Sequence, residues 1–314
     1  TRDPAWENIC LAVRTLESPD DATARRFFEA NFRVHRMNPE GGREGLITGY
    51  YEPLLNGSRV KTKRFRYPVY GRPDDLVVVD LGALYPELQG KRYRGRLNSN
   101  RVVPYYSRAE MSNGKRPPDS AVLAWVDDPV ALFFLEIQGS GRIRLPDGKM
   151  LHVGYADQNG HPYVAIGRTL VDSGAMKLEE ATMPAIRAWL KANPVKAQAV
   201  LNSNPSYVFF TLREPDNSGP IGALNVPLQP ERSIAVDPNF IPLGSPVWFD
   251  TSLPDAAERP YRRLVFAQDT GGAIRGPVRA DLFLGFGENA ERIAGTMRQR
   301  GKLFVLLPAD RKLN

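Results

Sequence analysis

The segment FAQDTGGAIRGPVRADLFLG, residues 266–285, places two short apolar runs on either side of a glycine-rich turn. The first run ends in Asp269, and Asp281 stands twelve positions later, at the start of the second run. Glycine tolerates the backbone conformations that tight turns need, so this turn lets the chain reverse direction. We therefore predict that both carboxylates lie at the same end of one β-barrel.

The remaining sequence alternates short apolar runs with Pro, Gly and Asn, which indicates many short strands. This spacing is typical of antiparallel barrels with a few helices and not of a doubly wound βαβ fold. The predicted strands cover residues 76–81, 131–138, 206–212, 245–250, 263–269 and 302–308. The predicted fold class is therefore mainly β with some α.

Three regions predict helices. Residues 18–33 begin with Ser, Pro and two Asp, which suit a helix N-cap and first turn. Residues 162–202 form a second helical region, in which Gly174 suits a C-cap. A third helix is predicted over residues 288–301, again closed by a glycine. The polar segment REPDNSGPIG, residues 213–222, is the best candidate for a linker.

The composition limits the classes of function. A chain of 314 residues, of which 42% are hydrophobic, has room for about two domains. No run reaches the roughly 18 apolar residues of a membrane span. One cysteine, Cys10, and three scattered histidines, His35, His152 and His161, argue against disulfides and a zinc site, and we expect no metal or other cofactor. Because the chain begins at Thr1, which is not a natural initiator, we expect a processed or trimmed form, so that any signal or lipid anchor is out of view.

The charge favours an acidic polymeric partner. The formal net charge is +7 and the isoelectric point about 9.5, which suit nucleic acid, an anionic membrane or an acidic polysaccharide without choosing among them. The densest basic cluster is SRVKTKRFRY, residues 58–67, which interleaves cations with aromatic residues. Two interpretations are open for it: a solvated strand pair, or the wall of a groove that faces a polyanion.

Several catalytic motifs are missing or incomplete. QGSG, residues 138–141, is only part of a nucleophile turn, and no phosphate-binding loop is present. Asp269–Gly271 reads DTG and Asp172–Gly174 reads DSG, and aspartic proteases join two such turns. However, the second turn ends a helical pattern rather than a strand, so it does not mirror the first. General acid–base chemistry by a carboxylate, for example on a sugar, is the simplest remaining mechanism.

Six segments, taken in order, resemble the MltA family of lytic murein transglycosylases, and together they span about residues 45–307. Its signature segments are matched by TGYYEPLLNGS (48–58), LEIQGSGRIRLPDG (135–148), GYADQNGHPYVAIG (154–167) and NPSYVFF (204–210). Its C-terminal three-aspartate module is matched by SIAVDPNFIPLGSPVWF (233–249) and FAQDTGGAIRGPVRADLFLGFG (266–287).

This resemblance implies a specific fold. Members of the family have a double-psi β-barrel domain that both ends of the chain build, which here corresponds to residues 1–55 and 215–314. A second β-barrel domain is inserted, here over residues 56–214. The resemblance also implies a deep groove between the two barrels that holds the glycan strand.

The resemblance further implies a lyase that acts on peptidoglycan. The family cleaves the β-1,4 bond between N-acetylmuramic acid and N-acetylglucosamine without water, and the muramyl 6-hydroxyl group closes a 1,6-anhydro ring. One carboxyl group can perform both proton transfers. The main alternative, from another class of function, is a non-catalytic glycan-binding protein that keeps the same groove.

Within the family, the acid/base residue lies in the motif that reads ADLFLG here, which assigns the role to Asp281. Apolar neighbours and the supporting carboxylates Asp269 and Asp237 would raise its pKa. Arg275 and Arg279 would lower it, and we expect both to face solvent or substrate. From the residues alone, an outward-facing strand position for Asp281 and turn-forming roles for Asp237 and Asp269 stay open.

Other residues are candidates for substrate binding. Thr48, Tyr50 and Glu52 alternate along one predicted strand, so one face can carry all three to the groove, although inward packing of the tyrosine is an alternative. Gln138 and Ser140 suit hydrogen bonds to a glycan or a peptide stem, or else a plain hairpin turn.

The expected partner is the glycan strand of peptidoglycan, and no nucleic acid is expected. Asp157 and His161 are weaker candidates for function. We expect membrane contact only if a lipid anchor precedes this sequence. A monomer in the periplasm of a Gram-negative bacterium, associated with the outer membrane, is the resulting prediction.

Overall fold

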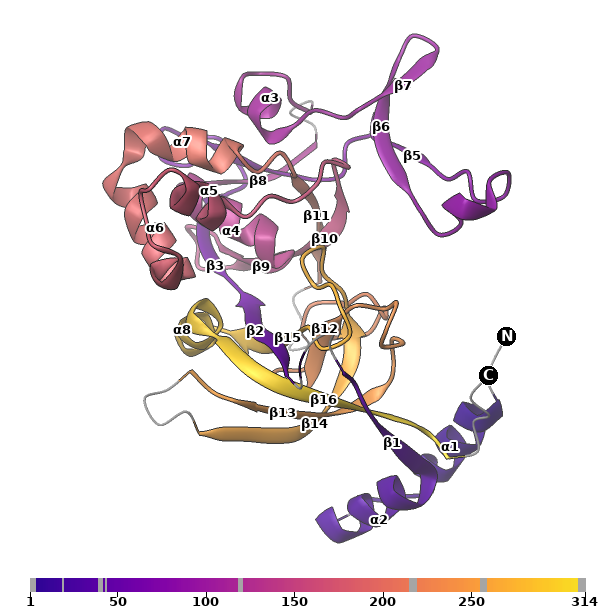
Figure 1. Cartoon of the computed structure of the whole chain (residues 1–314). Coiled ribbons are helices and arrows are strands. Elements are labelled where there is room, and N and C mark those ends of the chain that lie inside the picture. The colour runs from indigo at the N-terminus through magenta and orange to yellow at the C-terminus, as the bar shows by residue number, and fades with distance from the viewer. Residues whose placement is uncertain are drawn as a thin grey trace. The chain divides into compact units, whose positions relative to one another are not determined.

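The structure is a computed structural model that describes residues 4–18, 20–38, 42, 44–117, 121–214, 219–254 and 259–309 (Figure 1). Two compact units make up the chain. The first consists of Thr1–Gly49, Ile221–Phe283 and Met297–Asn314, and the second of Tyr50–Pro220 and Leu284–Thr296. Both units are built on β-sheets, and the second also carries helices, which confirms the predicted fold class, mainly β with some α. The domain bounds predicted from the sequence, the double-psi connectivity and the groove stay predictions.

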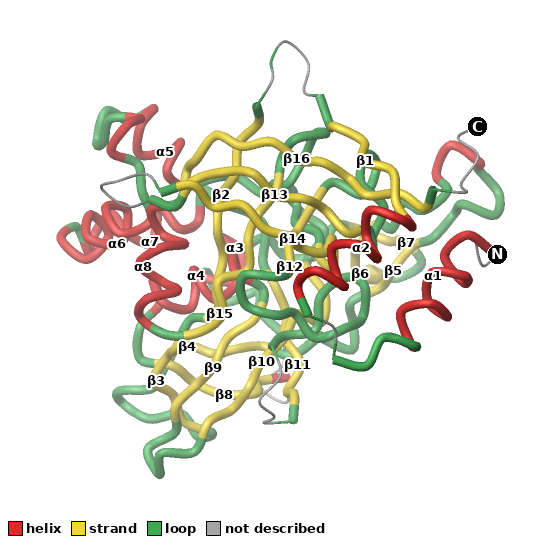
Figure 2. Tube along the Cα trace, turned by 90° about the horizontal axis from the view of Figure 1, so that it is seen from below, coloured by secondary structure: helices red, strands yellow, loops and turns green. Residues whose placement is uncertain are grey.

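The first unit is built on a closed ring of six strands, in the order β16, β13, β14, β12, β15 and β2, with β2 returning to β16 (Figure 2). A seventh strand, β1, adds to the outer part of β16. The strands are β1 (Phe32–Arg36), β2 (Gly45–Glu52), β12 (Ser233–Val236), β13 (Pro246–Ser252), β14 (Pro260–Asp269), β15 (Ala280–Phe286) and β16 (Arg298–Pro308). β12 runs parallel to β14 and antiparallel to β15.

Inward-facing and outward-facing residues alternate along these strands, and the inward-facing side chains that fill the ring are apolar. Ile234 of β12 pairs with Leu282 of β15, and both side chains are fully buried. Phe249 of β13 is also fully buried. Since successive side chains on a strand point to opposite faces, Asp281 lies on the other face of β15 from Leu282. The barrel core therefore fixes which way Asp281 points.

The ring closes where two glycines face each other. Gly301 of β16 pairs with Gly45 of β2, and a Cβ on Gly301 would lie 2.6 Å from Cγ1 of Ile47. This pairing corrects the helix predicted over residues 288–301. The helix α8 covers only Glu288–Thr296, because the following residues are needed to close the barrel.

Two helices precede the barrel, α1 (Pro4–Arg14) and α2 (Asp21–Asn31). The second confirms the helix predicted near residues 18–33, and its N-cap Asp20 accepts a hydrogen bond from the backbone of Thr23. Aromatic residues of both helices pack around Phe32 of β1. This small cluster attaches the N-terminal helices to the edge of the first unit.

The second unit contains a six-stranded sheet in the order β11, β10, β9, β3, β8 and β4. A single parallel bridge between Gly71 and Phe210 joins the end of β4 to β11, so the two edges of the sheet meet. The strands are β3 (Leu54–Ser58), β4 (Tyr67–Tyr70), β8 (Val122–Val126), β9 (Ser140–Arg144), β10 (Met150–Gln158) and β11 (Val208–Arg213). A separate three-stranded sheet consists of β5 (Val77–Val79), β6 (Tyr93–Asn98) and β7 (Arg101–Val103).

Helices cover part of the second unit. They are α3 (Arg108–Ser112), α4 (Pro129–Gln138), α5 (Ile166–Asp172), α6 (Met183–Ala192), α7 (Pro194–Asn202) and α8, with 3-10 turns at Pro86–Leu88 and Leu178–Glu180. The helical region predicted over residues 162–202 is confirmed as α5, α6 and α7. Gly174 has a φ of +71°, as its predicted C-cap position requires.

The strand predicted over residues 131–138 was wrong, because this segment is the helix α4. Asp128 caps its N-terminus, Pro129 opens its first turn, and Gly139 ends it in the left-handed conformation. The other predicted strands are confirmed as β11, β13, β14 and β16, and the strand near residues 76–81 as the shorter β5.

Two further predictions concern loops. The predicted linker, residues 213–222, starts at the last residue of β11, and residues 215–218 lie outside the described residues. The basic cluster at 58–67 is mostly a loop between β3 and β4. Its Arg64 pairs with Asp127 at 2.8 Å, and Lys61 lies over the Trp125 ring. These contacts favour a solvated, locally paired segment.

Candidate functional site

The candidate acid and its neighbour lie on either side of one residue in the barrel. Ala235 of β12 pairs with Asp281 of β15 on one side and with Asp269 of β14 on the other. Residues paired across strands present their side chains to the same face of a sheet. Asp269 and Asp281, twelve positions apart in the sequence, therefore lie on the same face of the sheet, with only β12 between their strands.

Thr48 completes this row from the next strand, β2. Its Oγ1 donates a hydrogen bond of 2.6 Å to Oδ1 of Asp281. Of the residues proposed for the site, Thr48, Asp269 and Asp281 are thus brought together in the first unit. The contact engages Oδ1 of Asp281 and orients the carboxyl group.

Burial dominates the electrostatics of Asp281, whose pKa is raised above its ordinary value. Loss of water around the carboxylate is the main cause, and the negative charge of Asp269 adds to it. The hydrogen bond from Thr48 and the positive charge of Arg279 act in the opposite direction but do not outweigh the burial. The carboxyl group therefore favours its neutral, protonated form more than an exposed aspartate does.

The two nearby arginines behave differently from each other. Arg275 is exposed, as expected. Arg279, expected to face solvent or substrate, is half-buried, and its Nη1 donates to the backbone carbonyl of Ala280 at 2.6 Å and, more weakly, to that of Leu46 at 3.4 Å. Burial also lowers the pKa of Arg279. The backbone holds its guanidinium, and its charge lowers the pKa of Asp281 by less than burial raises it.

Asp237 anchors the glycine-rich turn that connects the two other aspartates. It follows β12, is 3% exposed, and its Oδ2 accepts a hydrogen bond of 2.9 Å from the backbone of Gly276. Its Oδ1 accepts from the backbone and the side chain of Asn239. These bonds, with the Gly276 contact as the largest cause, hold the pKa of Asp237 below its ordinary value. Asp237 therefore fits the role of an ionised residue that shapes the loop.

Asp269 is less enclosed than Asp237. It is half-buried at the end of β14, and its Oδ1 accepts a hydrogen bond of 3.0 Å from the backbone of Ala223. This bond fixes the segment after Ile221 against the end of the strand. Asp269 thus makes a turn-holding contact, one of the roles that the sequence left open for it, and its negative charge also raises the pKa of Asp281.

The remaining candidates lie in the second unit. Oε1 of Gln138, at the end of α4, accepts a hydrogen bond of 3.0 Å from the backbone of Tyr51, so the side chain ties this helix to β2. Tyr50 and Ser140 are buried, at 8% and 6% exposure. The turn around Ser140 is not a hairpin, because Gly139 is the C-cap of α4 and β9 starts directly after it.

Glu52 is the centre of a buried ionic group. Its side chain is only 1% exposed and lies 3.1 Å from Arg142 and 3.4 Å from Arg213. One carboxylate thus holds two guanidinium groups, so this cluster keeps one excess positive charge. Sequence inspection missed both arginines, because they stand 90 and 161 positions from Glu52 and only the fold brings them together.

The weaker candidates have structural partners. Asp157 is buried between Arg94 at 3.0 Å and Arg72 at 3.3 Å, and it links β10 to the three-stranded sheet. A ring nitrogen of His161, Nε2, lies 2.7 Å from the backbone carbonyl of Tyr105. Both residues stabilise the second unit through these contacts.

Two family models match the chain. The MltA specific insert domain matches residues 46–211, and the 3D domain matches residues 232–307. The chain is also similar to membrane-bound lytic murein transglycosylase A of Escherichia coli strain K12, with 34% identity over 270 residues, which is 84% of this chain. The chain spans 66% of that relative's length, slightly less than two thirds.

Solved structures give the same result for the fold. The crystal structure of MltA from Neisseria gonorrhoeae is similar with a TM-score of 0.83 and 37% identity, covering 99% of this chain and 85% of the other. The crystal structure of E. coli MltA with bound chitohexaose is similar with a TM-score of 0.74 and 28% identity, covering 92% of this chain and 79% of the other.

Proposed function

Because this chain belongs to the MltA family, we propose that it is a lytic transglycosylase that cleaves peptidoglycan. In this proposal the bond broken is the β-1,4 bond between N-acetylmuramic acid and N-acetylglucosamine. The product carries a 1,6-anhydromuramic acid end, and Asp281 is the single acid/base residue. The names of the similar proteins support the substrate class.

The observation that carries the proposal is the enclosure of Asp281 in the row of Thr48, Asp281 and Asp269, which raises the pKa of its carboxyl group. A general acid has to hold its proton before the reaction, and burial raises the pKa of this carboxyl group. Because Oδ1 accepts a hydrogen bond from Thr48, we assign the transferred proton to Oδ2 in this proposal. The same hydrogen bond supports the carboxylate that remains after the proton has left.

The proposed reaction needs one carboxyl group and consumes no water. Oδ2 of Asp281 donates its proton to the glycosidic oxygen while the bond from that oxygen to the anomeric carbon breaks, which frees the 4-hydroxyl group of N-acetylglucosamine. The carboxylate then takes the proton of the muramyl 6-hydroxyl group as that oxygen bonds to the anomeric carbon. The proton returns to Oδ2, so the step regenerates the enzyme.

This scheme differs from that of ordinary glycosidases, which use two carboxylates at defined separations. Asp269 and Asp237 are both engaged with backbone N–H groups, at Ala223 and Gly276. We infer that these two aspartates support Asp281 through the local field and the loop geometry. Neither is required to exchange a proton with the sugar.

We propose that β2 and the end of α4 supply substrate contacts, through Thr48, Tyr50, Gln138 and Ser140. Glu52 acts less directly, because its carboxylate is enclosed and neutralised by two arginines. Its role in the proposal is to position Arg142, whose side chain is 22% exposed and able to meet a polar sugar group.

The expected location follows from the proposed substrate. We propose that the protein acts in the periplasm of a Gram-negative bacterium as a monomer, close to the outer membrane. In the described part of the chain, no helix has both the length and the apolar character needed to cross a bilayer.

The decisive experiment is digestion of purified sacculi followed by chromatography and mass spectrometry of the fragments. We expect fragments with anhydromuramyl ends. Asp281→Asn should lower turnover by about a thousandfold or more, because both proton transfers lose their carrier. Asp250→Asn, which changes a paired aspartate on β13, is the matched control and should keep full turnover.

Other products would contradict the proposal in distinct ways. Reducing muramyl ends would identify a hydrolase, since water would then have replaced the 6-hydroxyl group. Glycan binding without any cleavage would identify a non-catalytic binding protein. Full turnover by Asp281→Asn would move the acid/base role to another carboxylate, with Asp269 next to be tested.

A further inference from the structure

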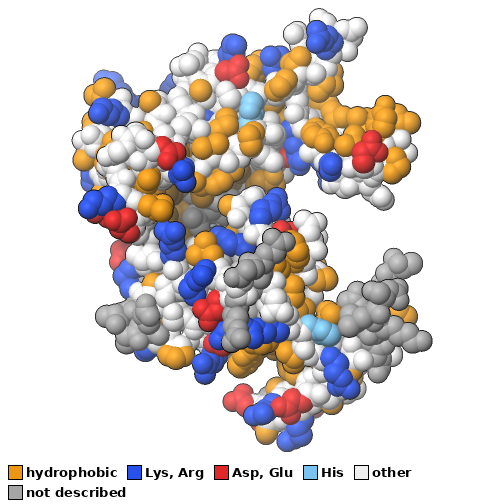
Figure 3. All heavy atoms as spheres, in the orientation of Figure 1, with side chains coloured by type: hydrophobic (Ala, Val, Ile, Leu, Met, Phe, Trp, Pro, Cys, Tyr) orange, Lys and Arg blue, Asp and Glu red, His pale blue; other side chains and the backbone are white. Residues whose placement is uncertain are grey.

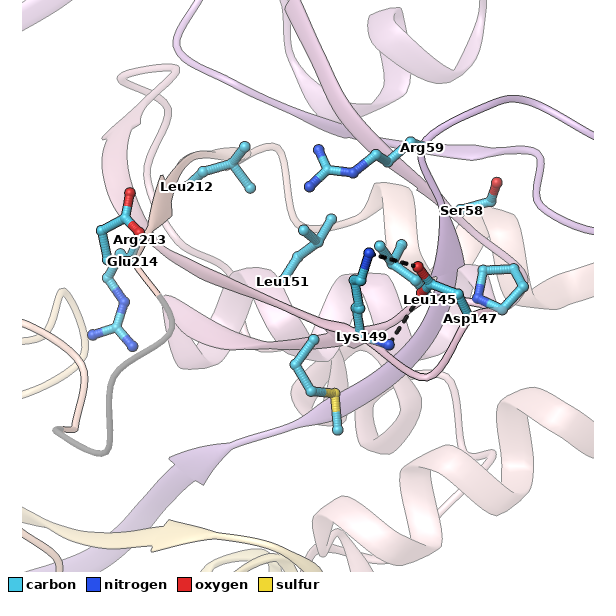
Figure 4. Close-up of a pocket in the computed structure, with 11 residues that line it drawn as sticks. Ser58, Arg59, Leu145, Asp147, Lys149, Leu151, Leu212, Arg213 and Glu214 are labelled. Carbon is cyan, nitrogen blue, oxygen red and sulfur yellow. Dashed lines mark hydrogen bonds and ion pairs between the residues drawn. The ribbon is translucent and has the colours of Figure 1, made fainter.

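A pocket of about 600 Å³ lies in the second unit, at the end of its six-stranded sheet (Figure 4). Its walls are the ends of β3 and β11 and the connection from β9 to β10, which contribute Arg59, Asp147, Lys149 and Glu214 among others. None of the residues proposed above for the catalytic site lines it. Its volume is in the range of pockets that bind small ligands.

The charged residues of the pocket are not all paired. Lys149 lies 3.4 Å from Asp147, and Arg213 binds Glu52 and the backbone carbonyl of Gly219. Arg59 and Glu214 are exposed, and neither has an ion-pair or hydrogen-bond partner in the described part of the chain. The pocket therefore offers one free positive and one free negative charge.

Apolar side chains separate these two charges. Leu212 lies between Arg59 on one side and Arg213 and Glu214 on the other in the view of Figure 4, and Leu151 lies below it in that view. Leu212 is 43% exposed although it faces a pocket, so a ligand could bury apolar surface on it. A complementary ligand has a carboxylate and an ammonium group joined by a short, partly apolar chain.

We propose that this pocket binds a short zwitterionic peptide, with the peptide carboxylate at Arg59 and its ammonium group at Glu214. The proposal rests on the proposed function for its source, because peptidoglycan strands carry short stem peptides with free carboxylate and amino groups. The pocket would thus recognise the peptide part of the substrate, separately from the sugar bonds that are cleaved.

Binding is tested by isothermal titration calorimetry with N-acetyl-L-alanyl-γ-D-glutamyl-meso-diaminopimelic acid. Its N-terminus is acylated, as it is in a glycan strand, so its ammonium group is the one on diaminopimelic acid. Arg59→Ala and Glu214→Gln should each raise the Kd about tenfold, as expected for the loss of one charge-assisted contact. The same peptide with the diaminopimelic amino group acetylated and the carboxylates amidated, which lacks the ammonium and carboxylate groups, should bind as weakly to the wild type. Arg144→Ala removes an exposed arginine from the same sheet and should leave the Kd unchanged.

Three binding results would overturn the proposal. They are no binding of the tripeptide, unchanged binding by both pocket variants, or equal losses in Arg59→Ala and Arg144→Ala. The last result would mean that only general positive charge attracts the peptide. The two pocket variants change opposite charges, so a nonspecific charge effect would move their Kd values in opposite directions.

An activity assay separates this proposal from the proposed function. With glycan strands stripped of peptides, Arg59→Ala and Glu214→Gln should turn over like the wild type. With peptide-bearing strands, both should show a KM raised several-fold with kcat unchanged. Absence of anhydro products from either substrate would remove the proposed function, while tripeptide binding by calorimetry would still support the pocket.

Discussion

Asp281 is poised between neighbours that shift its pKa in opposite directions. Thr48 lowers the pKa of this carboxyl group through its hydrogen bond, and Asp269 raises it through its charge. If Asp281 must be protonated to act, kcat/KM falls as the pH rises through this pKa. Thr48→Val should move that fall to higher pH, and Asp269→Asn should move it to lower pH. The measurement is the pH profile of kcat/KM on sacculi.

The two variants are predicted to shift the pH profile in opposite directions, so each serves as the control for the other. Thr48→Val should also lower kcat/KM about tenfold near the optimum, because the carboxyl group loses its fixed orientation. Shifts of both profiles in the same direction would contradict the assigned geometry, and so would two unshifted profiles.

The raised pKa of Asp281 also has a cost in stability. Because its pKa is higher in the folded than in the unfolded protein, the folded state binds more protons above the unfolded pKa, and stability falls as the pH rises through the folded pKa. Asp281→Asn keeps the oxygen that accepts from Thr48 and removes the charge. We expect this variant to be about 1 kcal/mol more stable at pH 7, although the proposed role of Asp281 predicts that it is inactive.

Urea unfolding at two pH values tests this expectation. At a pH below about 3.9, the ordinary pKa of aspartate, the carboxyl group is neutral in both states and the gain should vanish. A gain of equal size at both pH values would show that packing, and not the charge, is responsible.

At the scale of elements, the cap of α4 decides whether its apolar sequence forms a helix. Asp128 accepts hydrogen bonds from the backbone of Val130 at 2.8 Å and of Ala131 at 3.2 Å. Asp128→Ala should lower the free energy of unfolding by about 1 kcal/mol, the usual cost of a lost N-cap. Asp172→Ala, which removes only an exposed ion pair with Arg168, should change it by less than about 0.5 kcal/mol. Equal effects in urea unfolding would show that the cap does not stabilise α4.

The same helix shows where sequence patterns fail. Five consecutive residues of α4, Leu132–Glu136, are buried, so the segment lacks the one-sided pattern that identifies a surface helix. A short apolar run does not distinguish a buried helix from a buried strand. The preceding Asp-Pro and the following Gly were the available signals for a helix. Strands such as β13 and β14 were predictable because turn-forming residues mark their ends in the sequence.

The candidate site was predictable only in part, for a related reason. Asp269 and Asp281 lie in one short segment, and the glycines between them indicate the reversal that brings them together. The orientation of Arg279 depends on carbonyl groups of two strands, and the grouping of Arg142 with Glu52 depends on the fold of the second unit. Such contacts have no local pattern in the sequence.

At the scale of the whole molecule, the main electrostatic feature is a net positive charge. The chain has 42 Lys and Arg against 35 Asp and Glu, and Figure 3 shows the blue cationic side chains spread over the visible face. A dispersed excess of this kind attracts an anionic polymer over a distance without selecting its sequence or linkage. It should therefore govern the rate of association with sacculi and leave the chemistry at Asp281 unchanged.

Salt separates these two contributions. Raising the ionic strength from about 0.1 M to about 1 M shortens the screening length from about 10 Å to about 3 Å. The association rate with sacculi, measured by rapid mixing or surface binding, should then fall about tenfold or more. The affinity for uncharged chitohexaose should stay within about twofold, because hydrogen bonds and sugar stacking do not depend on long-range charge. If both quantities fell together, the salt would be acting on the sugar-binding residues themselves, and the dispersed positive charge would lose its role in finding the cell wall.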